Sequence, residues 1–172
     1  IAEKFTSMLA GAMGAMKVGP GIDRGNQVGP MINERSRDDI AKMVQEAVDS
    51  GAGVAVGASV PDRTGYFYEP TVLSGVSPDA AILDQEIFGP VAPVVLFDTD
   101  DEAIAMANDT VHGLIAYVYT GDLARGLQTA EALESGMVGL NRGLVSDPAA
   151  PFGGVKQSGI GREGSHEGIE EF

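Results

Sequence analysis

Apolar residues recur at helical spacing in two segments near the start of the chain. The first stripe consists of Phe5, Met8, Leu9, Ala12, Met13 and Met16, and it stops at the helix-breaking sequence Gly19-Pro20-Gly21. The second stripe consists of Ile40, Met43, Val44, Ala47 and Val48. Asn33 is the expected N-cap of the second helix, and Gly51 is its expected stop. The pattern predicts two helices, each with one buried face.

Three later segments are typical of β-strands. Residues 53–58 are apolar, residues 66–73 are rich in aromatic and β-branched side chains, and a turn at 61–65 separates them. Residues 91–97 are almost continuously apolar. A continuous apolar run is typical of a parallel strand that is covered on both faces.

From residue 91 onward, strand-like and helix-like segments alternate. The expected order is a strand at 91–97, a helix at 100–108, a strand at 114–119, a helix at 122–134 and a strand at 137–140. Alternation at such short spacing requires right-handed βαβ crossovers and a parallel sheet, so the sequence predicts an α/β fold. A Gly- and Pro-rich loop at 142–162 follows, and loops of this length are usually functional. A short helix at 162–171 is expected to close the chain.

Length and charge narrow the class of protein. The 172 residues, 44% of them hydrophobic, suffice for one core, so we expect one domain over residues 1–172. The 25 acidic residues against 11 Lys and Arg give a net charge of −14, which disfavours nucleic acid or an anionic membrane as a partner. The sequence has neither an apolar run of about eighteen residues nor a signal-peptide pattern. We therefore expect a soluble, cytoplasmic protein whose partners are small molecules or proteins.

The chain contains no cysteine, which excludes disulfides, thiolate metal sites and a cysteine nucleophile from these residues. The two histidines, His112 and His166, have no partner at metal-ligand spacing, so we predict no metal site.

Two matches to ligand-binding motifs are rejected by their context. Residues 159–164 read G-x-G-x-x-G, but no buried strand precedes them and only eight residues follow. Positive φ angles and close packing are the better explanation of these glycines. Residues 98–109 begin like a calcium-binding loop, but Ala103 stands where the loop needs glycine and Asp109 where it needs glutamate. Helix capping is the better explanation there.

Two further motifs carry a family resemblance. They are Glu86-Ile-Phe-Gly-Pro90 and the segment from Pro151-Phe-Gly-Gly154 to Ser158-Gly-Ile-Gly-Arg-Glu163. They resemble the C-terminal half of the aldehyde dehydrogenase superfamily, whose motifs read E-x-F-G-P and P-F-G-G-x-K-x-S-G-x-G-R-E. The segments 98–108, 113–117 and 136–141 between them also follow the family's order and spacing. Within the superfamily, residues 141–154 and 161–171 are most similar to succinate-semialdehyde dehydrogenases.

This resemblance implies a three-layer, Rossmann-like parallel sheet flanked by helices. It also implies a mechanism in which a cysteine thiolate attacks the aldehyde, the adduct gives hydride to NAD or NADP, and water activated by a glutamate hydrolyses the thioester. Family members are more than twice as long, their catalytic cysteine would fall shortly before Ile1, and Ile1 is not an initiator methionine. We therefore expect residues 1–172 to be a fragment of the catalytic domain that lacks the cofactor domain, the nucleophile and the general base, and that is inactive alone. The full-length enzyme is expected to be a homo-oligomer.

For the cofactor, the resemblance implies three residues of this chain. The Glu86 carboxylate would accept hydrogen bonds from the nicotinamide-ribose hydroxyls, the Phe88 ring would pack near the nicotinamide, and Leu114 is a weaker candidate of the same kind. The competing interpretations are a surface glutamate before a turn and ordinary core packing for the apolar residues. The sequence does not separate NAD from NADP.

For the substrate, the resemblance implies Ser146 and Phe152, both in the loop at 142–162. Ser146 would help to bind a distal carboxylate, and Phe152 would line the aldehyde tunnel. Because one neutral donor does not hold a carboxylate without a cation, arginines are also required. Arg142 is a candidate, with a surface or structural salt bridge as the competing interpretation. Asn141 and Arg142 follow the last predicted strand, which puts them at the carboxyl edge of the sheet.

Two alternatives to a semialdehyde dehydrogenase stay open from the sequence. One is a non-catalytic interaction or assembly module that keeps the fold without the chemistry. The other is an aldehyde dehydrogenase of another substrate class.

Overall fold

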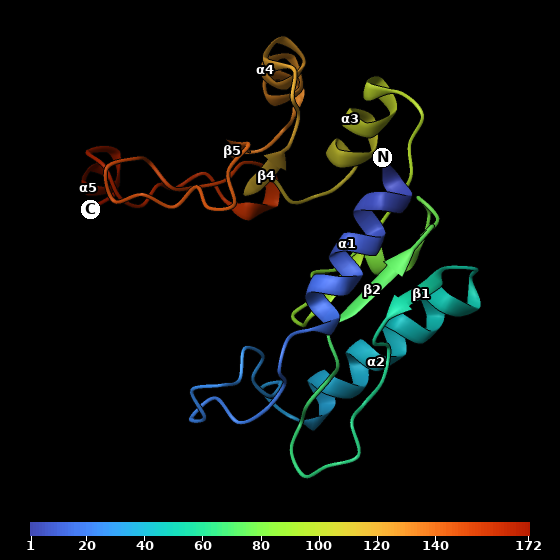
Figure 1. Cartoon of the computed structure of the whole chain (residues 1–172). Coiled ribbons are helices and arrows are strands. Elements are labelled where there is room, and N and C mark those ends of the chain that lie inside the picture. Colours follow the sequence, from blue (N-terminus) through green and yellow to red (C-terminus); the bar gives the residue numbers. More distant parts are fainter. The chain divides into compact units, whose positions relative to one another are not determined.

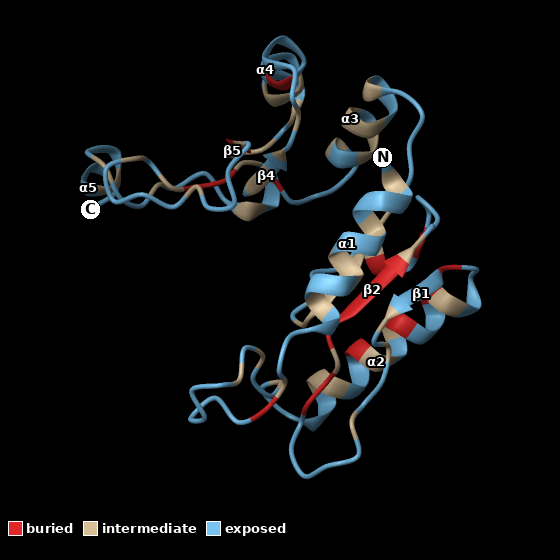
Figure 2. Ribbon diagram, in the orientation of Figure 1, coloured by how far each residue is buried: buried red, intermediate tan, exposed pale blue.

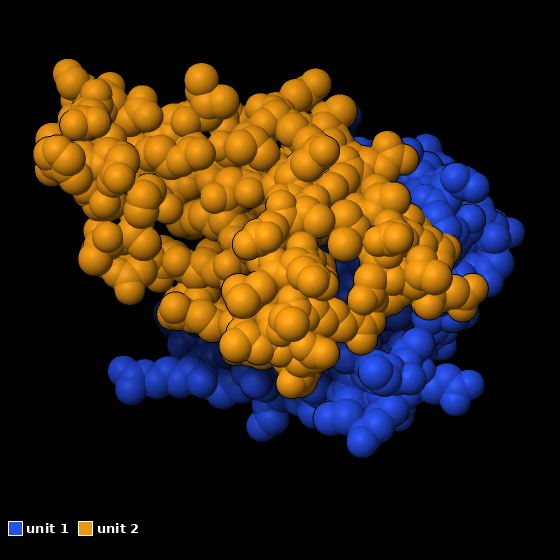
Figure 3. All heavy atoms as spheres, turned by 90° about the horizontal axis from the view of Figure 1, so that it is seen from above, with its two compact units in different colours: residues 1–96 blue, residues 97–172 orange.

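The computed structural model describes all residues from 1 to 172 and divides into two compact units, Ile1–Leu96 and Phe97–Phe172 (Figure 3), where the sequence led us to expect one domain. Both units combine helices with small sheets, which confirms the α/β class (Figure 1).

The first unit is a three-stranded sheet with a helix on either side. The strands are β1 (Gly53–Val56), β2 (Thr71–Ser74) and β3 (Val91–Pro93), in the order β1-β2-β3. α1 (Ala2–Gly14) lies along β1 and β2, and α2 (Glu34–Asp49) packs against the other face together with the short 3-10 helix η1 (Ala81–Leu83). Figure 2 shows the buried residues concentrated in β2 and α2. The core consists of Ile40, Val44, Ala47, Ala52, Tyr68, Leu73, Val76, Ala80 and Ile82.

The boundaries of α2 confirm the predicted helix signals. The Asn33 side chain accepts a hydrogen bond from the Ser36 backbone N–H at 2.8 Å, as an N-cap does. Ser50 ends the helix, and Gly51 follows with φ 106°, a left-handed conformation that glycine adopts without strain. Both signals are local, so the sequence alone identified them.

The first two strands are shorter than predicted, and their pairing differs from a purely parallel sheet. β1 pairs with β2 antiparallel, and a register shift lies between Val54 and Val56. Of the predicted strand at 66–73 only residues 71–73 pair, together with Ser74 beyond it, because Pro70 before them has no N–H to donate. Phe67 and Tyr68 are nevertheless buried.

The third strand corrects a second expectation. β3 pairs with β2 in parallel, as predicted, but it forms the edge of the sheet and covers only Val91–Pro93 of the predicted 91–97. Pro93 lacks an N–H and is tolerated because the strand is at the edge. Leu96 and Phe97 are 53% and 51% exposed. The expectation that both faces of the whole segment are covered is therefore wrong.

The second unit contains a βαβ motif. β4 (Ile115–Val118) and β5 (Met137–Leu140) pair in parallel, and α4 (Leu123–Ala132) connects them, which confirms the second of the two predicted crossovers. The first does not form, because β3 pairs with β2 in a different sheet from β4. α3 (Asp100–Asn108) precedes β4. Thr99 caps α3 through the Glu102 N–H at 3.2 Å, which confirms helix capping for the segment that began like a calcium loop.

The end of the chain is less helical than predicted. η2 (Lys156–Ser158) is a single 3-10 turn, and α5 covers only Glu167–Glu170 of the predicted 162–171. Gly164 and Ser165 have φ angles of 67° and 54°, so their left-handed backbone delays the helix. None of the helices in this chain has the length and apolar character that a bilayer crossing requires.

Candidate functional site

The segment before β3 presents Glu86 and Phe88 to solvent. Ile87 packs against the core of the first unit, and a Cβ atom at Gly89 would overlap the Ile40 side chain, so these two residues hold the backbone against α2. Glu86 and Phe88 alternate with them and are exposed, Phe88 by 76%. Core packing is therefore excluded for Phe88 within this unit. The Glu86 carboxylate forms no hydrogen bond or ion pair within the chain, so both of its oxygens are free to accept.

In the second unit, Leu114 and Phe152 line one hollow of about 350 Å³. The other lining residues are Gly153, Gly154, Ser158, Gly161, Arg162, Glu163 and Glu171. Leu114 directly precedes β4, so this hollow lies at the amino end of that strand. The loop at 142–162 leaves the carboxyl end of β5 and returns to the amino end of β4.

Three glycines allow this return. A Cβ atom at Gly136, which precedes β5, would overlap the carbonyl oxygen of Gly153. Gly153 and Gly154 are both buried, and the Cβ of a larger residue at Gly154 would lie 2.8 Å from Cβ of Ser158. The sequence P-F-G-G therefore has a packing reason: only glycine lets these backbones approach so closely.

Backbone hydrogen bonds fix Phe152 beside the closing segment. Its N–H donates to the Glu163 carbonyl and its carbonyl accepts from the Glu163 N–H, both at 2.8 Å. Arg162 Nη1 donates to the carbonyls of Gly154, Ile160 and Gly161 at 2.9–3.0 Å. Gly159 and Gly164 have positive φ angles, as predicted for the rejected G-x-G-x-x-G match, which follows η2 rather than a strand. These contacts shape the wall of the hollow and leave Phe152 half-buried.

The residues at the start of the loop lie at the other end of β5. Asn141 has φ 53°, accepts from the Thr120 N–H at 3.0 Å and donates to the Thr120 carbonyl at 2.9 Å, so its amide joins the carboxyl ends of β4 and β5. This position confirms the predicted carboxyl edge for Asn141. Arg142 and Ser146 are exposed, and neither lines the hollow of Leu114 and Phe152. Arg142 forms no ion pair within the chain, so the salt-bridge interpretation has no support here.

A polar cluster around Lys156 has no local signature in the sequence. Lys156 Nζ lies 2.6 Å from Glu134 Oε2 and donates to the Asn108 carbonyl at 2.7 Å. Lys156 is a fixed position of the second motif, and that motif was the only signal for it, because its partners are distant in sequence.

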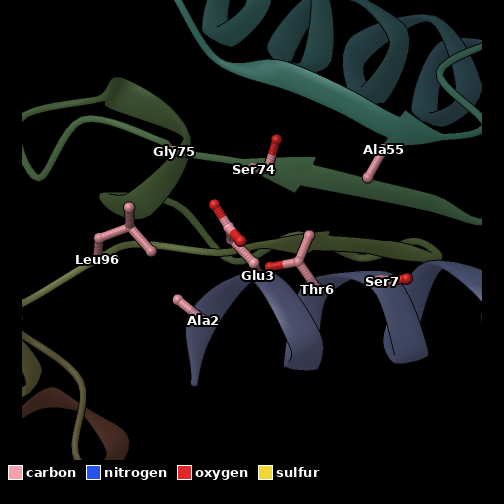
Figure 4. Close-up of a pocket in the computed structure, with 8 residues that line it drawn as sticks. All are labelled: Ala2, Glu3, Thr6, Ser7, Ala55, Ser74, Gly75 and Leu96. Atoms are coloured by element: carbon pink, nitrogen blue, oxygen red, sulfur yellow. The ribbon is translucent and has the colours of Figure 1, made fainter.

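A second hollow, of about 360 Å³, lies in the first unit under the first turns of α1. Figure 4 shows Glu3, Thr6 and Ser7 of this helix opposite Ser74 and Leu96. The hollow contains no pairing of a nucleophile with a base, and no group of three His, Asp or Glu residues in the chain could hold a metal ion. It has no catalytic constellation.

The groups with shifted pKa values line neither hollow. Burial raises the pKa of Tyr68, which is a core residue. A hydrogen bond from Arg125 lowers the pKa of Asp100, and a hydrogen bond from Ser165 lowers that of Glu167. None of these groups belongs to a candidate site, so the acid–base chemistry of a reaction is not supplied by them.

Comparisons with known proteins give one consistent result. Residues 1–172 match the model of the aldehyde dehydrogenase family. A succinate-semialdehyde dehydrogenase of Paenarthrobacter nicotinovorans is 55% identical over all 172 residues, which are 38% of its length. A glutarate-semialdehyde dehydrogenase of Pseudomonas putida is 44% identical over 99% of the chain and 35% of its own length. The chain thus spans about a third of the length of these relatives.

Solved structures that resemble this chain belong to the same family of enzymes. A succinate-semialdehyde dehydrogenase from Burkholderia pseudomallei has a TM-score of 0.95 and 46% identity, over 99% of this chain and 35% of that one. An aldehyde dehydrogenase of Mycobacterium tuberculosis complexed with NAD+ has a TM-score of 0.92 and 36% identity, over 99% and 35% of the two chains.

Proposed function

This chain belongs to the aldehyde dehydrogenase family, and from that membership we propose that it is part of an NAD(P)-dependent enzyme that oxidises succinate semialdehyde, or a similar aldehyde, to the carboxylic acid. The observation that carries the proposal is the 55% identity to a succinate-semialdehyde dehydrogenase along the entire chain. In this proposal, residues 1–172 are a fragment of the catalytic domain.

The cofactor-facing residues of the chain are Glu86, Phe88 and Leu114. A carboxylate that has no partner within the chain suits two adjacent ribose hydroxyls, because each of its oxygens accepts one hydrogen bond. Phe88 offers an exposed aromatic surface two residues away. These residues fit a nicotinamide cofactor, which would accept hydride from the substrate when bound.

The substrate-facing residues are Phe152, Ser146 and Arg142. Phe152 supplies an apolar wall to the hollow at the amino end of β4. Ser146 donates one neutral hydrogen bond, which is too weak alone to hold a carboxylate. The Arg142 guanidinium is exposed and has no acidic partner in the chain, so it is available to pair with the distal carboxylate of a semialdehyde. Other arginines of the full-length polypeptide would complete this site.

The covalent step requires a thiolate, and these residues contain no cysteine. The nucleophile and the general base would come from other parts of the polypeptide. We therefore expect the purified 172-residue chain to form no NADH or NADPH when it is given any aldehyde.

The test compares the full-length polypeptide that contains this segment with residues 1–172 alone. Formation of NADH and NADPH is followed at 340 nm with succinate semialdehyde, glutarate semialdehyde and a neutral aldehyde of similar length. The proposal expects turnover by the full-length protein, with the highest kcat/KM for succinate semialdehyde, and none by the short chain. Turnover by the short chain would disprove its incompleteness, and a folded full-length protein that oxidises no aldehyde would favour a non-catalytic module.

A second candidate substrate is glutarate semialdehyde, because the Pseudomonas putida relative that acts on it is 44% identical over nearly the same residues. The two substrates differ by one methylene, which changes kcat/KM by about 10- to 200-fold in a shaped pocket. The same assay ranks them. The subunit composition of the full-length enzyme, which we propose to be a homo-oligomer, is measured by sedimentation.

A further inference from the structure

Lys156 is held by three acceptors from two other parts of the second unit. Its Nζ atom lies 2.6 Å from Glu134 Oε2 and donates to the carbonyls of Asn108 and Thr110, at 2.7 and 3.2 Å. An ammonium group has three N–H donors, so these contacts satisfy all of them. The Lys156 side chain is only 24% exposed. Charge-assisted hydrogen bonds of a largely buried ammonium group are stronger than the hydrogen bonds of a lysine that is exposed to solvent.

The backbone around Lys156 is attached to the same segment of chain. Gln157 N–H donates to the Val111 carbonyl and Val155 N–H to the Gly113 carbonyl, both at 2.9 Å. In return, Gly113 N–H donates to Ser158 Oγ at 3.0 Å. Lys156 itself has φ 54°, which is unusual for a residue with a side chain. The tertiary contacts hold this conformation.

The backbone of the acidic partner, Glu134, is itself fixed. Asn108 accepts from the Glu134 backbone N–H at 2.8 Å and donates to the Ala132 carbonyl at 2.9 Å. The end of α3 is thereby tied to the end of α4, and Lys156 joins the glycine-rich loop to both.

We propose that Lys156 is a positioning residue that fixes Phe152, the proposed substrate wall, relative to Leu114, the proposed cofactor contact, and so determines which aldehydes fit against Phe152. Lys156 lines no part of the hollow. Lys156 is four residues after Phe152 in the loop. Its acceptors Asn108 and Thr110 lie in the segment that immediately precedes Leu114 in the chain. Without the Lys156 side-chain bonds, the loop is held to residues 108–114 only by the bonds of Val155, Gln157 and Ser158. The Phe152 wall then has more freedom to move, and the hollow loses its defined width. This inference rests on the proposed function.

The test uses the full-length enzyme with Lys156→Met, which keeps the length of the side chain and removes its donors. Glu134→Gln is a milder second variant that removes the charge of one acceptor. Lys42→Met is the matched control, because Lys42 pairs with Glu46 on the surface of α2 at 3.7 Å and is 74% exposed. The readout is the ratio of kcat/KM for succinate semialdehyde to that for glutarate semialdehyde. Loss of folded enzyme lowers both values equally and leaves this ratio unchanged.

We expect Lys156→Met to change the ratio by about tenfold, less than the ~100-fold cost of a 1 Å misplacement. Glu134→Gln should change it in the same direction, and Lys42→Met should leave it within about twofold. A ratio that stays within twofold of wild type in the folded variants overturns the proposal. If Lys156→Met does not fold, Glu134→Gln decides by the same criterion. An inactive wild-type enzyme overturns the proposed function as well, so the two failures are distinguishable.

Discussion

The exposed fraction of a side chain distinguishes structural residues of this chain from candidate functional ones. Phe67 is 5% exposed and Phe88 is 76% exposed, although both lie in short loop segments of the first unit. Arg63 stacks over the Phe67 ring at 4.1 Å. An exposed phenylalanine without a packing partner adds little to the stability of its own unit, so the Phe88 ring is available to a ligand or to another part of the polypeptide.

The two phenylalanines give a matched prediction. Phe67→Ala should lower the free energy of unfolding by about 3 kcal/mol, because it removes a buried ring. Phe88→Ala should change it by less than about 0.5 kcal/mol, yet raise KM for the nicotinamide cofactor in the full-length enzyme. Urea unfolding of the chain and steady-state kinetics measure the two effects. A large loss of stability with Phe88→Ala would contradict the assignment of this ring to the cofactor.

The residue scale also shows where sequence reasoning stops. Asn33 and Gly51 were identified because a cap and a stop act on neighbouring backbone. Lys156 was missed because its two carbonyl acceptors lie 46 and 48 positions earlier in the chain and its acidic partner Glu134 is also distant, and no local pattern predicts such contacts. The exposure of Phe88 was equally undecided, since a lone phenylalanine beside Gly89 and Pro90 fits a core or a ligand wall.

At the scale of elements, α3 and α4 are joined by the pair of Asp100 and Arg125. Arg125 Nε donates to Asp100 Oδ2 at 2.7 Å, and Nη2 donates to the other oxygen. The hydrogen bond from Arg125 holds the pKa of Asp100 below its ordinary value of 3.8, while partial desolvation opposes the shift. A carboxyl whose pKa is lower in the folded state stabilises the fold above its unfolded pKa, and this stabilisation is lost as the pH falls through the folded value.

Arg125→Gln should therefore raise the pKa of Asp100 towards its ordinary value, measured by NMR titration of the carboxyl. The difference in urea midpoint between wild type and this variant should be present near neutral pH and shrink below about pH 4. Arg35→Gln is the control, because Arg35 pairs only loosely with Asp39, at 3.7 Å. An Asp100 titration that is the same in wild type and Arg125→Gln would contradict the pairing.

The packing of elements in the second unit depends on Gly136. Because a Cβ atom there would meet the backbone of Gly153 rather than a flexible side chain, Gly136→Ala should destabilise the chain by about 1–3 kcal/mol. Gly121→Ala, at a position with open space and no positive φ, should be close to neutral. Thermal unfolding of both variants and of the wild type measures this difference. Equal melting temperatures for Gly136→Ala and Gly121→Ala would show that the backbone at Gly153 can move away from residue 136.

At the scale of the whole molecule, the α/β class and the parallel β4–α4–β5 crossover could be predicted, because alternation and connection length determine them. The antiparallel pairing of β1 and the shortening of β3 could not be predicted, because the partner of a strand depends on segments that are distant in sequence. The missing N–H groups of Pro70 and Pro93 limit a strand only once its partner and register are known. The general rule for open sheets placed ligands at the carboxyl edge, and it located Asn141 and Arg142. It did not anticipate that Phe152 returns to the amino end of β4, because only the glycine packing requires that path.

The amide of Asn141 has a practical consequence. It closes one end of the segment 142–151 through Thr120, and the paired backbones of Phe152 and Glu163 close the other end. A stretch held at one end by a side-chain amide and at the other by a backbone pair can be exchanged without changing the rest of the unit. When residues 142–151 are exchanged for the corresponding segment of a relative, Asn141 should be kept. Few other residues adopt its left-handed backbone conformation and also form both hydrogen bonds to Thr120.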